Sequence, residues 1–579
     1  MLSPKLLCKS TFFTIFVIIT FFGHEAHATP YDYTYTAECL ARPLKPQYNG
    51  GAVANPELNE GLTGWSSFGE SKIEHKESSD GNKYIVASTR NLSYHSFSQV
   101  LDLDKEKLYT FSGWFQVSQG EAEIAAVIKT KTSYEIVGWV IAHSGCWSML
   151  KGGFVVNVSG PADLHFQSKN TAVDIWADSI SLQPFSKDEW KSHQDQSIQK
   201  ARKTRVRLQA VDQHGQPLAN ATFSIRQQRS AFPFGCAINA NILQNTAYQN
   251  WFFSRFRYTV FGNDLKWYST ERSRGAEDYS TADAMVNLAK SRGVAIRGHN
   301  VFWDDPQYQP WWANGLAPGD LRTAADHRIK AVMGRYRGKF IHWDVVNENL
   351  HFRFFESKLG PDASRRFYTT ANKIDPRATP FLNDYNTIED SRDAASSPAN
   401  YLRKIWQLRA QGYKGPLGIG LEGHFPSSNL NLPYLRSAID TLSSARLPIW
   451  VTELDVQPGP NQASYLEQLL REIHSRSSVQ GIMLWSAWGP QGCYRMCLTD
   501  NNFRNLATGN VVDNFRYTLR RVADSVGTMD SDGFFEAELF HGKYQVNITG
   551  DGFSDFRTFD NRPSGELATM QFKLDVSAS

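Results

Sequence analysis

Two short apolar runs of this chain each end in a carboxylate. The run WDVVNE at 343–348 delivers Glu348 directly after the amide Asn347, and the run PIWVTELD at 448–455 delivers Glu453. Glycoside hydrolysis needs such a pair, with one carboxyl protonated to assist the leaving oxygen and one ionised to attack the sugar carbon or activate water. A single glutamate after a strand is usually a surface loop residue, so it is the pair that favours acid/base chemistry.

The two runs belong to a longer alternation of strand and helix patterns. Eight apolar runs lie at 234–239, 257–262, 294–302, 340–347, 380–384, 417–424, 447–454 and 479–488. Amphipathic helical patterns lie between them, at 281–292, 321–337, 401–411, 434–446 and 465–476. Eight β/α units predict an α/β fold, a (β/α)8 TIM barrel over 233–526. Catalytic groups of such barrels lie at the C-terminal ends of strands, where Glu348 and Glu453 fall on strands four and seven.

Strand patterns flank the predicted barrel on both sides. Region 50–184 alternates short strands with turn residues, which predicts an N-terminal β-sandwich, and the polar segment 185–203 predicts a linker or a solvated helix. The patterns over 204–232 and 527–576 match each other, and neither could bury a sheet face alone. We therefore expect one small β-sandwich that is split between the two ends of the barrel.

The first 28 residues have the pattern of a signal peptide. Lys5 and Lys9 precede an apolar stretch at 11–22 that is too short to span a bilayer, and AHA at 26–28 offers a cleavage site. We expect a secreted, extracellular glycoprotein with no membrane contact in its mature form. Glycosylation sequons begin at Asn91, Asn157, Asn220 and Asn547.

The cysteines fit an oxidising compartment. Cys8 leaves with the signal peptide, and we predict disulfides between Cys493 and Cys497 and between Cys39 and Cys146. Cys236 lies inside an apolar strand pattern and is expected to be a buried free thiol.

The charge balance argues against polyanionic partners. The chain carries 61 basic and 58 acidic residues, a net charge of +3. Its electrostatic field is therefore too weak to attract nucleic acid or anionic lipid. Sixteen Trp residues supply flat rings of the kind that stack on sugars, although most will pack in cores. We expect a monomer without a cofactor or a metal.

Motifs on successive strands resemble those of one family. WDVVNE and VTELDV, together with RGH at 297–299, NDLKW at 263–267, NDYN at 383–386 and GIGLEGH at 418–424, resemble glycoside hydrolase family 10, the xylanases. The resemblance runs from about 203 to 574 and is closest to plant members. The sandwich has NPEL at 55–58 and VDIWADSISL at 173–182, which resemble the family 22 carbohydrate-binding module. The resemblance implies a retaining endo-1,4-β-xylanase that acts on xylan and xylo-oligosaccharides of the plant cell wall.

The resemblance also implies a role for each matching residue. Glu348 would be the proton donor and later the base, Glu453 the nucleophile, and Asn347 would bind the sugar 2-hydroxyl. A mechanism that retains the anomeric configuration requires the two carboxyl groups to be only about 5 to 5.5 Å apart. His424 would orient Glu453, with Asp455 behind it. The other implied substrate-binding residues are Asn263, Lys266, His299, Trp303, Trp485 and Trp488. In the sandwich the rings that could stack on sugar, of which at least half should fill the core, are Trp65, Trp114, Tyr134, Trp139 and Trp147.

The chain departs from the family pattern at Gly262. Family members usually carry a glutamate there, which binds the sugar two places to the glycone side, and DDP at 304–306 replaces a nearby glutamine. We therefore predict an enzyme that is weak on short xylo-oligosaccharides. Three alternatives remain: a xylan endotransglycosylase, a catalytically weak wall polysaccharide-binding protein, and a metal hydrolase, which the lack of a closely spaced His pair disfavours.

Overall fold

The computed structural model describes residues 29–218, 220–519, 526–531, 533–550, 552–563 and 567–574. The predicted signal peptide over 1–28, including Cys8, lies outside the described residues.

Parallel strands form a closed barrel, as predicted. Its strands are β13 (Phe234–Ile238), β14 (Tyr258–Phe261), β15 (Ala295–Trp303), β16 (His342–Asn347), β17 (Thr379–Asp384), β18 (Gly418–Leu421), β20 (Ile449–Val456) and β21 (Val479–Leu484). The first and last strands pair, and β18 pairs with β20, so the ring closes. A short strand, β19 (His424–Phe425), pairs with the end of β20. The predicted TIM barrel is therefore confirmed.

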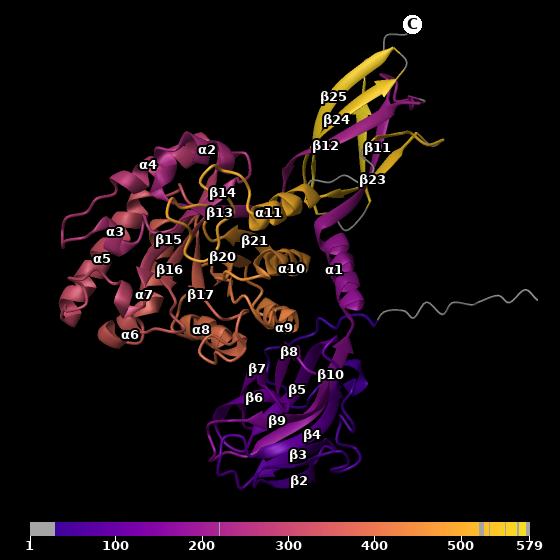
Figure 1. Ribbon diagram of the computed structural model, residues 1–579, viewed down its shortest axis with the longest axis vertical. Helices are drawn as coiled ribbons and strands as arrows, with labels where there is room; N and C mark the ends of the chain where they lie inside the picture. Colours follow the sequence, from indigo (N-terminus) through magenta and orange to yellow (C-terminus); the bar gives the residue numbers. More distant parts are fainter. Residues whose placement is uncertain are drawn as a thin grey trace, which may run out of the picture. The chain divides into compact units, whose positions relative to one another are not determined.

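Helices surround these strands (Figure 1). They are α2 (Thr246–Phe253), α3 (Trp267–Thr270), α4 (Ser280–Ser291), α5 (Pro318–Arg335), α6 (Phe354–Leu359), α7 (Ala363–Ile374), α8 (Pro398–Ala410), α9 (Leu432–Ser443), α10 (Gln462–Ser475) and α11 (Ala507–Thr518). Local signals fix where helices begin. The Ser397 side chain caps α8 by accepting from the backbone N–H of Asn400, and Pro398 fills the first helical position, which needs no N–H donor. Such starts set the length of the loops that follow the strand ends.

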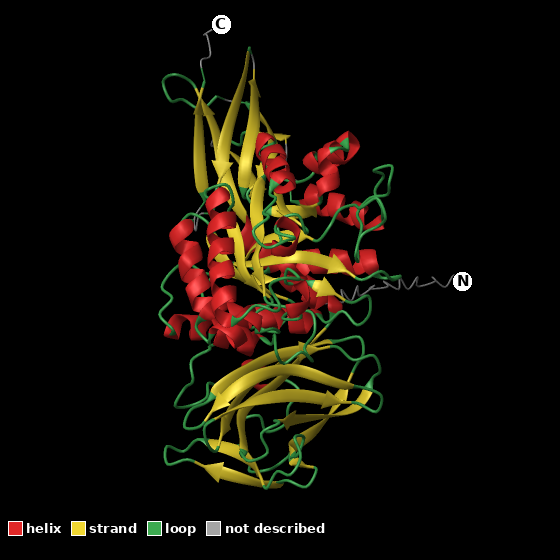
Figure 2. Cartoon of the chain, turned by 90° about the vertical axis from the view of Figure 1, so that its left-hand side faces the viewer, coloured by secondary structure: helices red, strands yellow, loops and turns green. Residues whose placement is uncertain are grey.

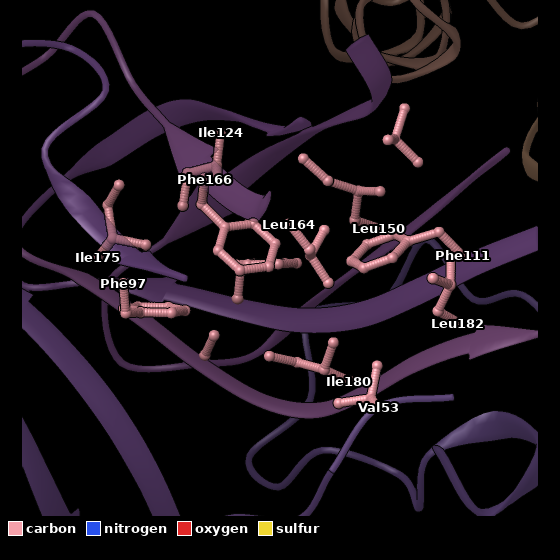
Figure 3. Packing of buried hydrophobic residues seen from close by; sticks show 14 of the residues in the cluster. Val53, Phe97, Phe111, Ile124, Leu150, Leu164, Phe166, Ile175, Ile180 and Leu182 are labelled. Carbon is pink, nitrogen blue, oxygen red and sulfur yellow. The ribbon is translucent and has the colours of Figure 1, made fainter. Parts of the chain in front are cut away.

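The N-terminal region is a β-sandwich of two five-stranded sheets, and Figure 2 shows it as strands joined by loops. The strands are β1 (Ser66–Phe68), β2 (Lys72–Glu77), β3 (Lys83–Ser88), β4 (Ser96–Leu103), β5 (Leu108–Val117), β6 (Glu121–Lys129), β7 (Tyr134–His143), β8 (Ser148–Phe154), β9 (Gly160–Gln167) and β10 (Ile175–Phe185). The sheet orders are β1-β4-β9-β6-β7 and β2-β3-β10-β5-β8. Phe97, Phe111, Leu150 and Phe166 interdigitate between the sheets (Figure 3), which excludes water from this core.

Most aromatic residues of the sandwich that could stack on sugar are buried in it. Trp65, Trp114 and Trp147 are at most 6% exposed. The indole of Trp139 donates to the carbonyl of Ser391 in the loop after β17, at 2.8 Å. Among the five rings, Tyr134 alone is largely exposed, at 45%.

The segment expected to be a linker or a solvated helix is the helix α1 (Lys187–Arg202). Ser186 and Glu189 form a capping box at its start. Trp190 and Gln194 are buried, and both donate to Glu472 of α10. One face of this polar helix therefore packs on the barrel instead of facing water.

Segments before and after the barrel share two sheets. The strands are β11 (Lys203–Val211), β12 (Thr222–Ser230), β22 (Val526–Thr528), β23 (Phe535–Phe540), β24 (Gly542–Gly550), β25 (Phe553–Asn561) and β26 (Ala568–Lys573). Their orders are β23-β11-β26 and β22-β12-β24-β25. Val206, Phe223, Leu539 and Val546 meet in one core, so the two segments bury their apolar faces against each other.

The cysteines pair as predicted. Cys39 bonds to Cys146 and Cys493 to Cys497, while Cys236 is the one free cysteine among those described and is buried. The asparagines of the four sequons are all exposed. None of the described helices is long and apolar enough to cross a membrane.

Candidate active site

A cavity of about 930 Å³ opens where the barrel strands end. Ten residues predicted from the sequence as catalytic or substrate-binding line it: Asn263, Lys266, His299, Trp303, Asn347, Glu348, His424, Glu453, Trp485 and Trp488. They come from β15 and β20, from the end of β16 and the residue after it, from β19, and from the loops after β14 and β21. The barrel thus brings together residues up to 225 positions apart in the sequence.

Glu348 sits one residue beyond β16 and is held by its backbone. Its N–H donates to the carbonyl of Asn383 on β17 at 2.8 Å, and its side chain is nearly buried. Burial raises the pKa of Glu348 to about 8, and the charges of Asp384 and Glu453 act in the same direction. This carboxyl therefore keeps its proton at neutral pH.

Glu453, near the end of β20, has the opposite protonation state. Burial alone would raise the pKa of Glu453, but His299, His424 and Lys266 bring it to about 2. The imidazole Nδ1 of His299 lies 3.7 Å from Oε1 of Glu453, and Nε2 of His424 lies 3.5 Å from Oε2. The cavity thus holds one protonated and one ionised carboxyl.

A buried carboxylate orients His299 from behind. Asp344 on β16 lies 2.9 Å from the imidazole Nδ1 and accepts from the guanidinium of Arg297 at 2.7 Å. Both Asp344 and Arg297 are almost fully buried. Since these contacts fix the ring plane, His299 faces the cavity in one orientation.

His424 has a similar support. Asp455 on β20 lies 3.1 Å from its Nδ1 and accepts from Nε of Arg495 at 2.7 Å. Burial would lower the pKa of His424, but Asp455, Glu422 and Glu453 raise it well above its ordinary value. Asp455 does not line the cavity and lies behind His424.

Lys266 and three indoles form a wall of the cavity. The Lys266 ammonium donates to Oδ1 of Asn263 at 3.2 Å and lies 4.2 Å from the ring centroid of Trp303 and 5.8 Å from that of Trp485. Burial lowers the pKa of Lys266, against the pull of the nearby carboxylates. Trp488 is 6% exposed and donates to Asn501 at 2.9 Å, so it mainly packs the wall.

Two polar residues of the cavity region had no predicted role. The amide nitrogen of Asn383 lies 2.9 Å from Oδ1 of Asn347 and 2.8 Å from Oε1 of Glu453, and Thr452 donates to its amide oxygen. Glu422, nearly buried, is a third carboxyl of the lining. Both lie in the quoted motifs NDYN and GIGLEGH, and their position at strand ends was the available signal.

The chain is similar in sequence to known proteins over most of its length. Residues 224–494 match the model of the family "Glycosyl hydrolase family 10", and the match includes both Glu348 and Glu453. The chain is 37% identical to "Endo-1,4-beta-xylanase 5-like" of Arabidopsis thaliana over 90% of its own length and 89% of that protein. It is 40% identical to "Endo-1,4-beta-xylanase 5" of the same plant, over 79% and 82%, and 34% identical to "Endo-1,4-beta-xylanase 4", over 94% and 95%. The chain belongs to glycosyl hydrolase family 10.

Proposed function

We propose that this glycoside hydrolase is a secreted, retaining endo-1,4-β-xylanase that cleaves internal bonds of xylan in the plant cell wall. The observation that carries the proposal is the pair of buried carboxyls in one cavity, Glu348 and Glu453, whose surroundings raise the pKa of the first and lower that of the second. A double displacement needs one acid and one anion at neutral pH. The names of the Arabidopsis relatives support xylan as the substrate.

In the first step, an oxygen of Glu453 attacks the anomeric carbon while the bond to the leaving oxygen breaks. The carboxyl of Glu348 gives its proton to that oxygen, so the leaving sugar departs as a neutral alcohol. The product is an ester between the sugar and Glu453, and Glu348 is now a carboxylate. His424, supported by Asp455, and Asn383 hold the oxygens of Glu453 for this attack.

In the second step, Glu348 takes a proton from water, whose oxygen attacks the same carbon. The ester bond breaks and returns the electron pair to Glu453, and two inversions leave the anomeric configuration retained. Loss of the charge on Glu453 in the ester removes one of the charges that raise the pKa of Glu348, which favours its new role as a base.

The remaining residues of the cavity bind the sugar chain. Asn347 would bond to the 2-hydroxyl, while Asn263, Lys266 and His299 hold the glycone side. The indoles of Trp303, Trp485 and Trp488 offer apolar surface to the rings.

The N-terminal sandwich would attach the enzyme to xylan. Tyr134 is exposed, and its hydroxyl donates to Oε1 of Gln167 at 2.7 Å, which holds the phenol ring in place on the sheet. A Tyr134→Ala variant should bind insoluble xylan more weakly and cleave soluble oligomers at the wild-type rate. Equal binding by both proteins would remove Tyr134 from the proposal.

The same residues would serve a transglycosylase if a sugar acceptor outcompeted water in the second step. Labelled oligosaccharide acceptors decide between the two, since transfer products in excess of hydrolysis products would favour the transferase. The metal-hydrolase alternative predicts loss of activity with a chelator, whereas Lys266 and His424 already supply positive charge beside the carboxylates here.

The proposed function is tested with a panel of xylan, mannan and β-glucan on wild type and Glu453→Gln. Xylan should be the preferred substrate, and the variant should lose turnover by about 10⁴-fold or more while still binding xylan, because only the nucleophile is removed. Glu467→Gln on the exposed face of α10 is the matched control and should behave as wild type. Wild-type turnover by Glu453→Gln would show that the mechanism is wrong, and a wild-type protein that binds but cleaves nothing would be a wall-binding protein.

A further inference from the structure

A third carboxyl, which the mechanism above does not use, is held beside Glu453. The backbone N–H of Glu422 donates to the carbonyl of Asp384 at 2.9 Å, and the carbonyl of Glu422 accepts from the N–H of Glu453 at 2.8 Å. The side chain of Glu422 is 3% exposed and lines the cavity. The backbone therefore fixes two glutamates of adjacent strand ends next to each other.

These two carboxyls share the same hydrogen-bond donors. The amide nitrogen of Asn383 lies 3.2 Å from Oε1 of Glu422 and 2.8 Å from Oε1 of Glu453. Nε2 of His424 lies 3.4 Å from Oε2 of Glu422 and 3.5 Å from Oε2 of Glu453. One amide hydrogen of Asn383 is directed to Asn347, so one remains, and the imidazole nitrogen carries only one. These donors suffice for one ionised carboxylate and not for two.

The charges around the pair decide which carboxyl keeps a proton. Adjacent buried carboxylates repel each other, so one of them stays neutral. Against the effect of burial, His299, His424 and Lys266 lower the pKa of Glu453, whereas burial, together with the charges of Glu453 and Glu348, raises the pKa of Glu422 well above its ordinary value. The titratable and charged groups that face Glu422 are Lys266, Glu348, Tyr385, His424 and Glu453.

We propose that Glu422 enters the reaction as a neutral carboxylic acid, a positioning residue whose proton lies toward Glu453 and lets both carboxyls share the donors Asn383 and His424. This inference rests on the proposed function. The free enzyme then needs two protonated carboxyls, on Glu348 and on Glu422. On the alkaline side, kcat/KM falls with the slope of two protons, because losing either proton inactivates the enzyme.

The test is the pH profile of kcat/KM on a soluble xylo-oligosaccharide for wild type, Glu422→Gln and Glu389→Gln. Glutamine at 422 keeps a hydrogen-bond donor without a charge, so the variant should retain kcat/KM within about tenfold at the optimum. Its alkaline limb should fall with a slope lower by one proton. Glu389 is a matched control, because it is also a buried glutamate with a raised pKa and accepts from the backbone N–H groups of Gly423 and His424 at 2.8 and 3.0 Å. Its variant should keep the wild-type slope.

Two results overturn the inference. One is a folded Glu422→Gln with the wild-type slope, and the other is a folded Glu422→Gln that is inactive at every pH, which would mean that an ionised Glu422 is required. The wild-type profile tests the idea even if no variant folds, since an alkaline limb with the slope of one proton contradicts it. A wild-type protein without activity on xylan would instead overturn the proposed function.

Discussion

Two regions of this molecule bury several charged groups, and the groups have different partners in the two regions. Between α1, α9 and α10, Arg436 donates to both oxygens of Glu472 at 2.6 and 2.8 Å, and both side chains are fully buried. Trp190 and Gln194 of α1 donate to the same carboxylate. In the cavity, three carboxyls crowd together. Glu422 and Glu453 share the donors Asn383 and His424, and no guanidinium among the described residues pairs with Glu348, Glu422 or Glu453.

The difference separates structural charges from catalytic ones. Burial alone would raise the pKa of Glu472, but Arg436 holds it below its ordinary value. Burial raises the pKa of Glu348 without such a partner. Burial is therefore common to both regions, and pairing decides whether a buried carboxyl serves stability or proton transfer.

The largest effect should come from breaking the paired region. Glu472→Gln removes the carboxylate that accepts two hydrogen bonds from the buried Arg436 guanidinium, which should lower the free energy of unfolding by about 3 to 5 kcal/mol. Denaturant unfolding measures this loss, with Glu467→Gln, an exposed position on the same helix, as the control. If the unfolding midpoint of Glu472→Gln lies at the wild-type denaturant concentration, the ion pair of Arg436 and Glu472 does not stabilise the folded protein.

Replacing Glu348 in the crowded cavity should change the stability with the opposite sign and by a smaller amount. The neighbouring carboxyls take up part of the change in charge. The pKa of Glu348 is about 8 in the folded chain against 4.5 ordinarily, so between these pH values the folded state binds a proton that the unfolded state lacks. Stability should fall as pH rises through this window. Glu348→Gln removes this dependence, and its melting temperature should gain on wild type as pH rises from about 5 to about 8.

Glu453→Gln is the control for that series. The pKa of Glu453 is lowered to about 2, so its contribution to stability is present above the ordinary value of 4.5 and is lost as pH falls toward 2. Its melting-temperature difference from wild type should change less over the higher window than that of Glu348→Gln, because Glu453→Gln keeps the Glu348 carboxyl and removes only one of the charges that raise its pKa. A constant difference for Glu348→Gln would mean that Glu348 does not hold its proton.

The smallest effect should come from adding a carboxyl at the edge of the cavity. Gly262 lines the cavity, its φ lies outside the left-handed region, and a Cβ there would meet only the Ile238 carbonyl at 3.9 Å. The backbone therefore accepts a side chain. Gly262→Glu should raise kcat/KM on short xylo-oligosaccharides about tenfold, the worth of roughly 1.5 kcal/mol from one charged hydrogen bond. Gly262→Gln separates charge from shape, and a stably folded Gly262→Glu without any gain would show that this subsite is not the deficit.

The sequence predicted what depends on local patterns. Apolar runs and amphipathic helical patterns are local, so the barrel and the strand-end positions of Glu348 and Glu453 followed from them. The role of Asn383 could not be predicted, because it arises only when β16, β17 and β20 bring its amide between two side chains. The buried face of α1 could not be predicted either, because the helix is polar in composition and Trp190 contacts a residue, Glu472, that lies 282 positions away in the sequence.

The central claim is that Glu453 bonds covalently to the sugar while Glu348 supplies the proton. The most direct measurement is trapping with a xylobioside that carries fluorine at C2 and a good leaving group, followed by intact mass and peptide mapping. The fluorine slows the second step, so the ester should accumulate, with one sugar adduct per chain on the peptide that contains Glu453. An adduct on Glu348 or Glu422, or no adduct in a preparation that turns over xylan, would contradict the account.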